Sequence, residues 1–150
     1  MAGYIQTAKT IEWNTPKWLF EKLNKEFHFD LDPCCTHENA LCKNHFTKEE
    51  DGLRQNWGGQ TVYCNPPYGR EIADWVKKAA ESNALVVMLL PARTDTKWFH
   101  EYIYGKAEIR FIKGRLHFNE SKEGAPFPSM IVIFRGGNKL PEEEQLTMDL

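Results

Sequence analysis

The sequence lacks any long hydrophobic run, which argues against a transmembrane helix. Its longest apolar stretch, residues 84–90, has seven of the 150 residues, whereas a membrane-spanning helix needs about 20. Residues 1–4 also lack the basic and apolar regions of a signal peptide. We therefore expect a protein of the cytoplasm that has no membrane partner.

Cysteine is scarce as well, and this argues against a disulfide framework. The chain has four cysteines, and Cys34 and Cys35 are adjacent, so a bond between these two would be strained. Cytoplasmic proteins keep their thiols reduced. We therefore expect free thiols.

A large excess of charge of one sign is missing too. The net charge is −2 at pH 7, so the field of the whole molecule does not indicate a nucleic-acid partner. The distribution is uneven, because residues 93–122 contain seven Lys and Arg against four Asp and Glu. A local basic face is compatible with DNA binding, although an ordinary solvated surface explains the same pattern.

Patterns typical of helices and of strands alternate along the chain. Residues 72–81 place apolar side chains on one face of a helix. Three segments have the apolar character of buried strands, namely residues 62–64, 84–90 and 129–134. The alternation predicts one α/β domain over residues 1–150, with a mostly parallel sheet and an antiparallel edge.

Weaker patterns predict the remaining elements. Thr15 and Pro16 have the residue types of a helix N-cap and of a first helical position. We also expect strands at residues 27–31, 108–112 and 115–118, helices at residues 36–44 and 96–104, a flexible arm at residues 1–12 and an acidic tail at residues 137–150.

The most informative motif is Asn65-Pro66-Pro67-Tyr68-Gly69, which directly follows the strand at residues 62–64. The prolines remove two backbone N–H donors and stiffen the turn, which leaves carbonyl acceptors. The Asn65 amide adds an acceptor and the Tyr68 ring offers a stacking face. This set of groups suits an amino group on a flat heterocycle, although prolines alone are also common in turns.

A second polar motif ends the predicted strand at residues 27–31. Asp32-Pro33 follows this strand as Asn65-Pro66 follows the next one. Ligands of open α/β sheets bind at the carboxyl ends of strands. We therefore expect Asp32 and Asn65 to share one cleft.

Six segments in this order resemble the phage-type, Dam-like family of DNA N6-adenine methyltransferases, over roughly residues 13–134. The segments are Trp13–Pro16, Phe29–Cys35, Asp51–Leu53, Asn65–Gly69, Leu89–Asp95 and Gly114–Phe118. The resemblance implies a compact Rossmann-like methyltransferase fold and transfer of a methyl group from S-adenosyl-L-methionine to the N6 nitrogen of adenine in double-stranded DNA. It also implies a flipped-out target base, no metal, a phage or prophage origin, a bacterial host cell and a role linked to restriction-modification.

The resemblance assigns residues to these tasks. It gives the target adenine to the catalytic residues Asn65, Pro66, Pro67 and Tyr68. It gives the cofactor to Thr15, Pro16, Asp30, Asp32, Pro33, Cys34, Asp51 and Asn65. Asp51 would accept a hydrogen bond from the adenine amino group of the cofactor, and either Asp30 or Glu38 would bind its ribose. No glycine follows Asp32-Pro33, whereas larger relatives have a glycine-rich turn there.

Larger relatives also carry a separate target-recognition domain, for which this chain has no room. DNA contacts would come from loops, with Arg93, Lys97, Arg110, Lys113 and Arg115 as candidates. For each of them, an ordinary surface or structural charge is an equal alternative. A homodimer would enlarge the DNA footprint, and the sequence leaves this open.

Three other interpretations stay open. Cys34, His37, Cys42 and His45 form a Cys-x-x-His pair of motifs, which could bind zinc in a binding module. The four-residue spacing between the halves is shorter than in zinc fingers. The Asn-Pro-Pro-Tyr motif also serves methyltransferases that act on RNA or on glutamine amides of proteins. A DNA-binding protein with a decayed site is the third alternative.

Overall fold

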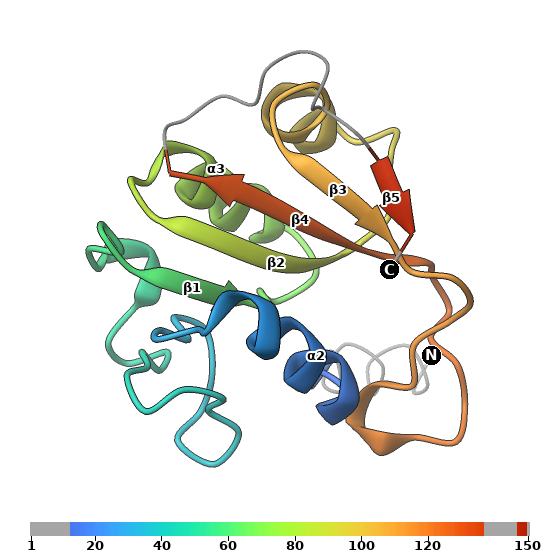
Figure 1. Ribbon diagram of the computed structural model, residues 1–150, viewed down its shortest axis with the longest axis horizontal. Helices are drawn as coiled ribbons and strands as arrows, with labels where there is room; N and C mark the ends of the chain where they lie inside the picture. Colours follow the sequence, from blue (N-terminus) through green and yellow to red (C-terminus); the bar gives the residue numbers. More distant parts are fainter. Residues whose placement is uncertain (1–12, 137–146, 150) are drawn as a thin grey trace.

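A five-stranded sheet forms the centre of the molecule in the computed structural model, which describes residues 13–136 and 147–149 (Figure 1). The predicted arm and residues 137–146 and 150 of the predicted tail lie outside the described residues. The strand order is β1-β2-β4-β3-β5. The strands are β1 (Thr61–Cys64), β2 (Leu85–Pro91), β3 (Glu108–Phe111), β4 (Ser129–Arg135) and β5 (Thr147–Asp149).

The sheet is mixed, so the prediction of a mostly parallel sheet with an antiparallel edge is not confirmed. β1 pairs in parallel with β2, and β3 with β5, whereas β4 is antiparallel to both β2 and β3. The reversed strand therefore lies inside the sheet. The apolar run at residues 84–90 indicates only that both faces of the strand are buried, which holds beside either kind of neighbour. The α/β class is confirmed.

Each α-helix of the described residues buries apolar side chains in the core. α3 (Ile72–Glu81) forms at the predicted residues and buries Ile72, Trp75, Val76 and Ala79, and it lies behind the sheet in Figure 1. α2 (Lys17–Phe27) buries Leu19 and Leu23. In the part of the chain that is described, no helix is long and apolar enough to cross a membrane.

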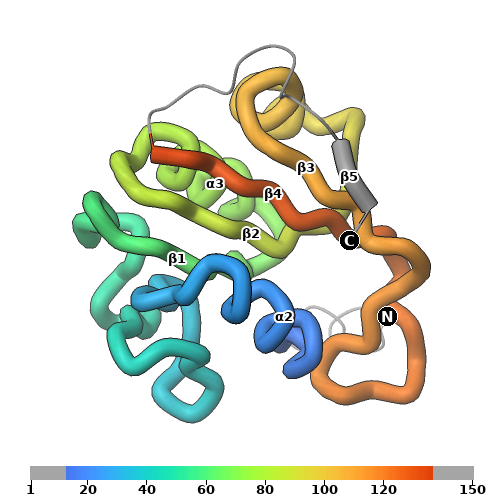
Figure 2. The backbone as a smooth tube through the Cα atoms, in the orientation of Figure 1, coloured from blue at the N-terminus to red at the C-terminus, as the bar shows by residue number. Residues whose placement is uncertain are grey.

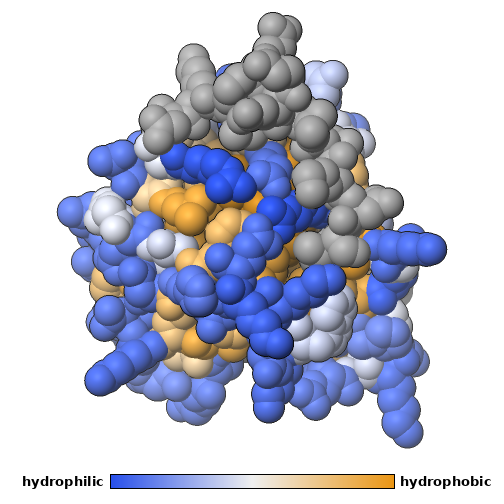
Figure 3. Space-filling view, in the orientation of Figure 1, coloured by the Kyte–Doolittle hydropathy of each residue, from blue (hydrophilic) through white to orange (hydrophobic). Residues whose placement is uncertain are grey.

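Short helical turns complete the list of elements. They are η1 (Gly52–Arg54), the π-helical η2 (Phe99–Ile103) and η3 (Phe118–Glu120). η2 lies within the helix predicted at residues 96–104. The strand predicted at residues 115–118 does not form, because residues 115–117 have no regular structure and η3 begins at Phe118. Figure 3 shows a hydrophobic area on one face of the molecule, surrounded by hydrophilic residues.

Some predicted elements between α2 and β1 do not form. Residues 36–44 contain turns instead of a helix, and the strand at residues 27–31 is reduced to isolated bridges from Leu31 to Val62 and from Asp32 to His45. The N-cap of α2 is Pro16 and not Thr15, and no side chain caps the helix. The Thr15 hydroxyl bonds elsewhere, as described below.

The strand directions gather the connecting loops at one edge of the sheet. β1, β2 and β3 run in the same direction, and β4 begins where they end. Asn65, residues 92–98 and residues 112–115 follow these three strands, and residues 118–128 precede β4. All four segments therefore lie toward the same edge of the sheet, and the orange loop that connects β3 to β4 is on the right of Figure 2.

Candidate active site

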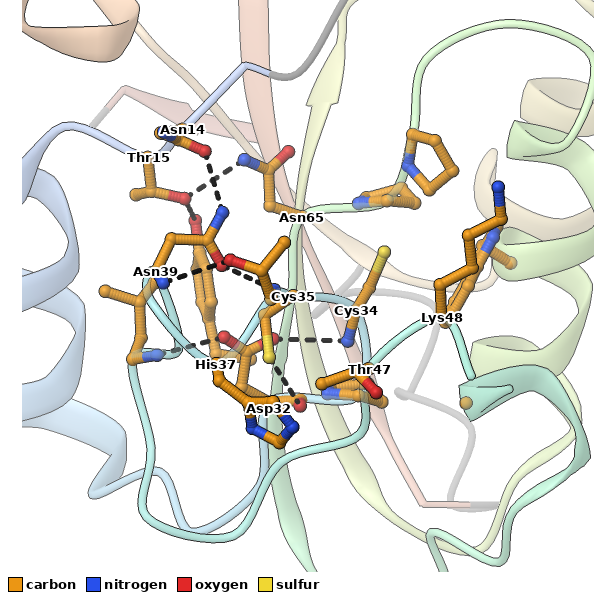
Figure 4. A pocket seen from close by; sticks show the side chains of 18 of the residues that line it. Asn14, Thr15, Asp32, Cys34, Cys35, His37, Asn39, Thr47, Lys48 and Asn65 are labelled. Carbon is orange, nitrogen blue, oxygen red and sulfur yellow. Dashed lines mark hydrogen bonds between the residues drawn. The ribbon is translucent and has the colours of Figure 1, made fainter. Parts of the chain in front are cut away.

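A cleft of about 820 Å³ opens at this edge and joins the two predicted motifs. Asp32 and Pro33 line it together with Asn65 and Pro66, as the sequence predicts. Figure 4 shows that side chains from several segments point into one space. The lining includes Thr15, Cys34, Glu38, Thr47, Lys48, Asp51, Gly52, Pro67, Glu71 and Trp75.

The carboxamide of Asn65 leaves one acceptor free in the interior. Its Nδ2 donates to the carbonyl of Trp13 and, over 3.1 Å, to Oγ1 of Thr15. Its Oδ1 is buried and has no hydrogen-bond partner among the residues that the structure describes. Because buried polar atoms are nearly always paired, an unpaired acceptor beside a cleft is suited to a ligand that donates a hydrogen bond.

The Thr15 hydroxyl connects Asn65 to β1. Its Oγ1 lies 2.7 Å from the hydroxyl of Tyr63, which is completely buried. Burial raises the pKa of Tyr63 far above its usual range, so this hydroxyl keeps its proton. Thr15 lines the cleft as predicted, but its hydroxyl contacts protein groups.

Tyr68 does not line the cleft. It is buried, its hydroxyl donates to the carbonyl of Leu89 over 3.0 Å, and its ring packs edge-on against Phe118 and Phe127. Trp13 packs against the same two phenylalanines at 5.4 and 5.3 Å. Trp13 is the member of this aromatic cluster that lines the cleft.

Asp32 organises the loop that follows it. Its side chain is 3% exposed, and its carboxylate accepts backbone N–H groups of Cys34 (3.2 Å) and Leu41 (3.1 Å). Burial raises the pKa of Asp32 to about 6, although these N–H groups oppose the change. Residues 33–41 thus fold around the carboxyl group, and no glycine-rich turn is required there.

The turn at Asp51 and Gly52 packs directly on Pro33. Asp51 has a left-handed φ of 56°, and a Cβ at Gly52 would lie 2.0 Å from the carbonyl oxygen of Pro33. Only glycine fits this contact. The carbonyl of Gly52 also accepts the indole N–H of Trp57 over 2.9 Å. Asp51 and Pro33 therefore share one wall of the cleft.

Some of the other predicted cofactor residues line the cleft, and others lie outside it. Cys34 lines the cleft, and so does Glu38, one of the two acids proposed for the ribose. Asp30, the other acid, is exposed outside the lining, and its carboxylate accepts the backbone N–H of Thr61. Pro16 is buried at the start of α2 and does not line the cleft.

The candidate DNA contacts also divide into two groups. Arg93, Lys97 and Lys113 are exposed on loops at the edge that carries Asn65, and they form no ion pair with any described residue. Arg115 is exposed as well, and it donates to the carbonyl of Ala125 over 3.1 Å.

Arg110 has a structural role that the sequence did not reveal. Its guanidinium bonds both carboxylate oxygens of Glu26 at 2.7 and 2.8 Å and also contacts Glu108. The hydrogen bond to Glu26 raises the pKa of Arg110 further above its usual range. Arg110 ties α2 to β3, so the interpretation of Arg110 as a DNA contact is not supported.

The described residues contain no cluster of metal ligands that would support the zinc alternative. His37 and His45 do meet, with ring nitrogens 2.9 Å apart. Across residues 13–136 and 147–149, however, no group of three or more His, Cys, Asp and Glu could hold a metal ion.

Sequence reasoning missed two contributors to the site. The sequence pattern indicates only that Tyr63 lies in a strand, and the Trp13 carbonyl is a backbone group with no sequence signature. Spacing could have indicated Tyr63, because it precedes Asn65 by two residues and side chains two apart share a strand face.

The fold and the site together define an α/β protein with a polar cleft at the carboxyl ends of its strands. Residues 5–146 match the family model described as DNA N-6-adenine-methyltransferase (Dam). The chain belongs to this family and is, by membership, an adenine-specific DNA methyltransferase.

Two relatives show the extent of the similarity. A DNA N-6-adenine-methyltransferase of Haemophilus phage HP1 (strain HP1c1) is 33% identical over 133 residues, covering 81% of this chain and 77% of the phage protein. A protein of the same description from Escherichia phage T1 is 37% identical over 109 residues, covering 69% of this chain and 45% of the phage protein.

Proposed function

We propose that this chain transfers a methyl group from S-adenosyl-L-methionine to the N6 nitrogen of an adenine that is flipped out of DNA. The observation that carries the proposal is the unpaired, buried Oδ1 of Asn65 beside the cleft. An acceptor held in this way suits an amino group, which offers two N–H donors. A target base must leave the duplex to reach it.

The cleft fits the cofactor in size and in the chemistry of its lining. Its volume of about 820 Å³ is in the range of cofactor sites, roughly 300–1,000 Å³. The carboxylates of Glu38 and Asp51 line it and could accept from ribose hydroxyls and from an adenine amino group. Pro33 and Cys34 would contact the methionine part. S-adenosyl-L-methionine would supply an electrophilic methyl group.

Asn65 and Pro66 would activate the target amino group. The nitrogen is a poor nucleophile, because its lone pair is delocalised into the ring. When Asn65 Oδ1 and the Pro66 carbonyl each accept one of its hydrogens, the lone pair localises and points out of the ring plane. An amide is too weak a base to remove the proton, which leaves after the nitrogen becomes positively charged. Catalysis then depends on positioning and electrostatics.

The aromatic cluster indicates which side chains can form the walls of the target pocket. Pro67 lines the cleft and Trp13 borders it, so these two can pack on a base directly. Tyr68 is buried against Phe118 and Phe127. Stacking of Tyr68 on the base would require these ring contacts to open, so we assign Tyr68 to the support of the pocket.

The DNA surface is proposed to be the edge that carries Asn65. Arg93, Lys97 and Lys113 project there, and cations of this kind bind phosphates. Arg115 would brace the loop that ends at Ala125.

We propose double-stranded DNA as the substrate and one catalytic domain of Rossmann-like form. We also propose that the protein acts in the cytoplasm of a bacterial host as part of phage restriction-modification. The common direction of β1, β2 and β3 supports that form.

The test is incubation of the purified protein with tritiated S-adenosyl-L-methionine and unmethylated duplex DNA, followed by nucleoside analysis. We expect label in N6-methyladenine. Asn65→Ala should lose this label, whereas Asn83→Ala, which truncates an exposed amide in the turn before β2, should keep it. Wild-type activity in Asn65→Ala would refute the proposed site. Parallel incubations with RNA and with protein serve as comparison, and label found only in RNA or in protein glutamine would reassign the substrate.

A further inference from the structure

We propose that Tyr63 and Thr15 are positioning residues, which orient the Asn65 carboxamide so that its Oδ1 faces the target amino group. This inference rests on the proposed function. It assigns a role to Tyr63, and it moves Thr15 from the cofactor to the target side of the site.

The hydrogen-bond inventory of Asn65 fixes the orientation of its amide. Nδ2 carries two hydrogens, and it has two acceptors, the Trp13 carbonyl and Oγ1 of Thr15. A backbone carbonyl can only accept, so the Trp13 carbonyl favours the orientation in which the amide nitrogen faces it. A flipped amide would place two oxygens against each other. Both hydrogens are thus used, and Oδ1 alone remains for a ligand.

Tyr63 decides what the Thr15 hydroxyl can do. A hydroxyl can donate or accept, so Thr15 alone could donate to an amide oxygen and stabilise the wrong orientation of Asn65. The Tyr63 hydroxyl lies 2.7 Å from Oγ1 of Thr15, in a completely buried position. This bond can run in either direction, and in the direction in which Thr15 donates to Tyr63, the lone pairs of Thr15 face Asn65 and only the amide nitrogen fits there.

The fold itself places these groups together. Tyr63 and Asn65 lie two residues apart at the end of β1, so their side chains share one face. Thr15 lies just before Pro16, the N-cap of α2, and bridges the two side chains. Phe20, one turn into α2, packs edge-on on the Tyr63 ring at 5.3 Å, which further restricts that ring.

The first test is kinetic. Tyr63→Phe and Thr15→Val each remove one hydroxyl at nearly constant volume. We expect kcat to fall about tenfold in each variant, the size of one lost hydrogen bond, while KM for DNA and for S-adenosyl-L-methionine changes less than about twofold. Thr15→Ser, which keeps the hydroxyl, should restore kcat. Ile133→Val, a core truncation in β4, is the control for a general loss of stability and should keep kcat.

The second test reads the orientation directly. In the wild-type protein, both Nδ2 protons of Asn65 should be shifted downfield and protected from exchange in ¹⁵N-edited NMR spectra. This protection should decrease in Tyr63→Phe and Thr15→Val and return in Thr15→Ser. If the wild type methylates adenine while both hydroxyl-deleted variants keep kcat and the amide signals, the positioning role is wrong. If the wild type itself does not methylate adenine, the proposed function fails instead.

Discussion

The pH dependence of folding stability should report the buried carboxyl group of Asp32. This group is 3% exposed, accepts two backbone N–H groups and forms no ion pair with any described residue, although nearby His45 slightly favours its charged form. Burial raises its pKa from 3.8 to about 6. The folded state therefore binds the proton more tightly than the unfolded state, so stability should fall as the pH rises through this interval.

The size of the effect follows from the two pKa values. One pH unit corresponds to 1.36 kcal/mol, so the interval between 3.8 and about 6 corresponds to about 3 kcal/mol for Asp32. Asp32→Asn removes the titration. Its amide can accept only one of the two N–H groups, which should cost about 1–3 kcal/mol at every pH.

The assay is urea denaturation of wild type and Asp32→Asn at several pH values from 4 to 7. The wild-type free energy of unfolding minus that of Asp32→Asn should decrease by about 2.4 kcal/mol between pH 4 and pH 7, because the other titrating groups cancel in the difference. A difference that stays constant or increases with pH would refute the reasoning. It would mean that the N–H groups of Cys34 and Leu41 stabilise the carboxylate more than burial destabilises it.

Three further substitutions separate structural from functional roles. Gly52→Ala should lower stability by about 1–3 kcal/mol, because its Cβ would meet the Pro33 carbonyl. It should also weaken cofactor binding in calorimetry. Tight cofactor binding in a stable Gly52→Ala variant would contradict this contact. Tyr68→Phe should lose about 1 kcal/mol of stability and keep its methylation activity, whereas loss of activity in the folded variant would assign the hydroxyl to the substrate. Arg110→Met should lower the urea midpoint without changing DNA affinity. If Arg110→Met instead binds DNA more weakly, while the salt dependence of DNA binding is unchanged in the control Lys97→Ala, Arg110 would be restored as a DNA contact.

The sequence predicted the elements whose patterns depend on local contacts. The helix at residues 72–81 has apolar residues at helical spacing, the strand at residues 129–134 is a continuous apolar run, and both form nearly as predicted. The helix at residues 36–44 does not form. This segment instead belongs to the loop around Asp32, whose carboxylate accepts the N–H of Leu41, and such a tertiary contact has no local signature. The position of β4 inside the sheet is likewise a long-range property.

The site was predictable at the level of segments and not at the level of atoms. Asp32 and Asn65 were expected in one cleft because polar residues that follow strands meet at one edge, whereas Asp51 was assigned only by the family resemblance. The use of each polar atom depends on partners that are distant in sequence, as for Asn65 with Trp13 and Thr15. The same amide would be an ordinary turn residue if its oxygen were paired. What makes Asn65 a candidate catalytic residue is that its surroundings take both hydrogens and leave the oxygen, and only a structure can show that division.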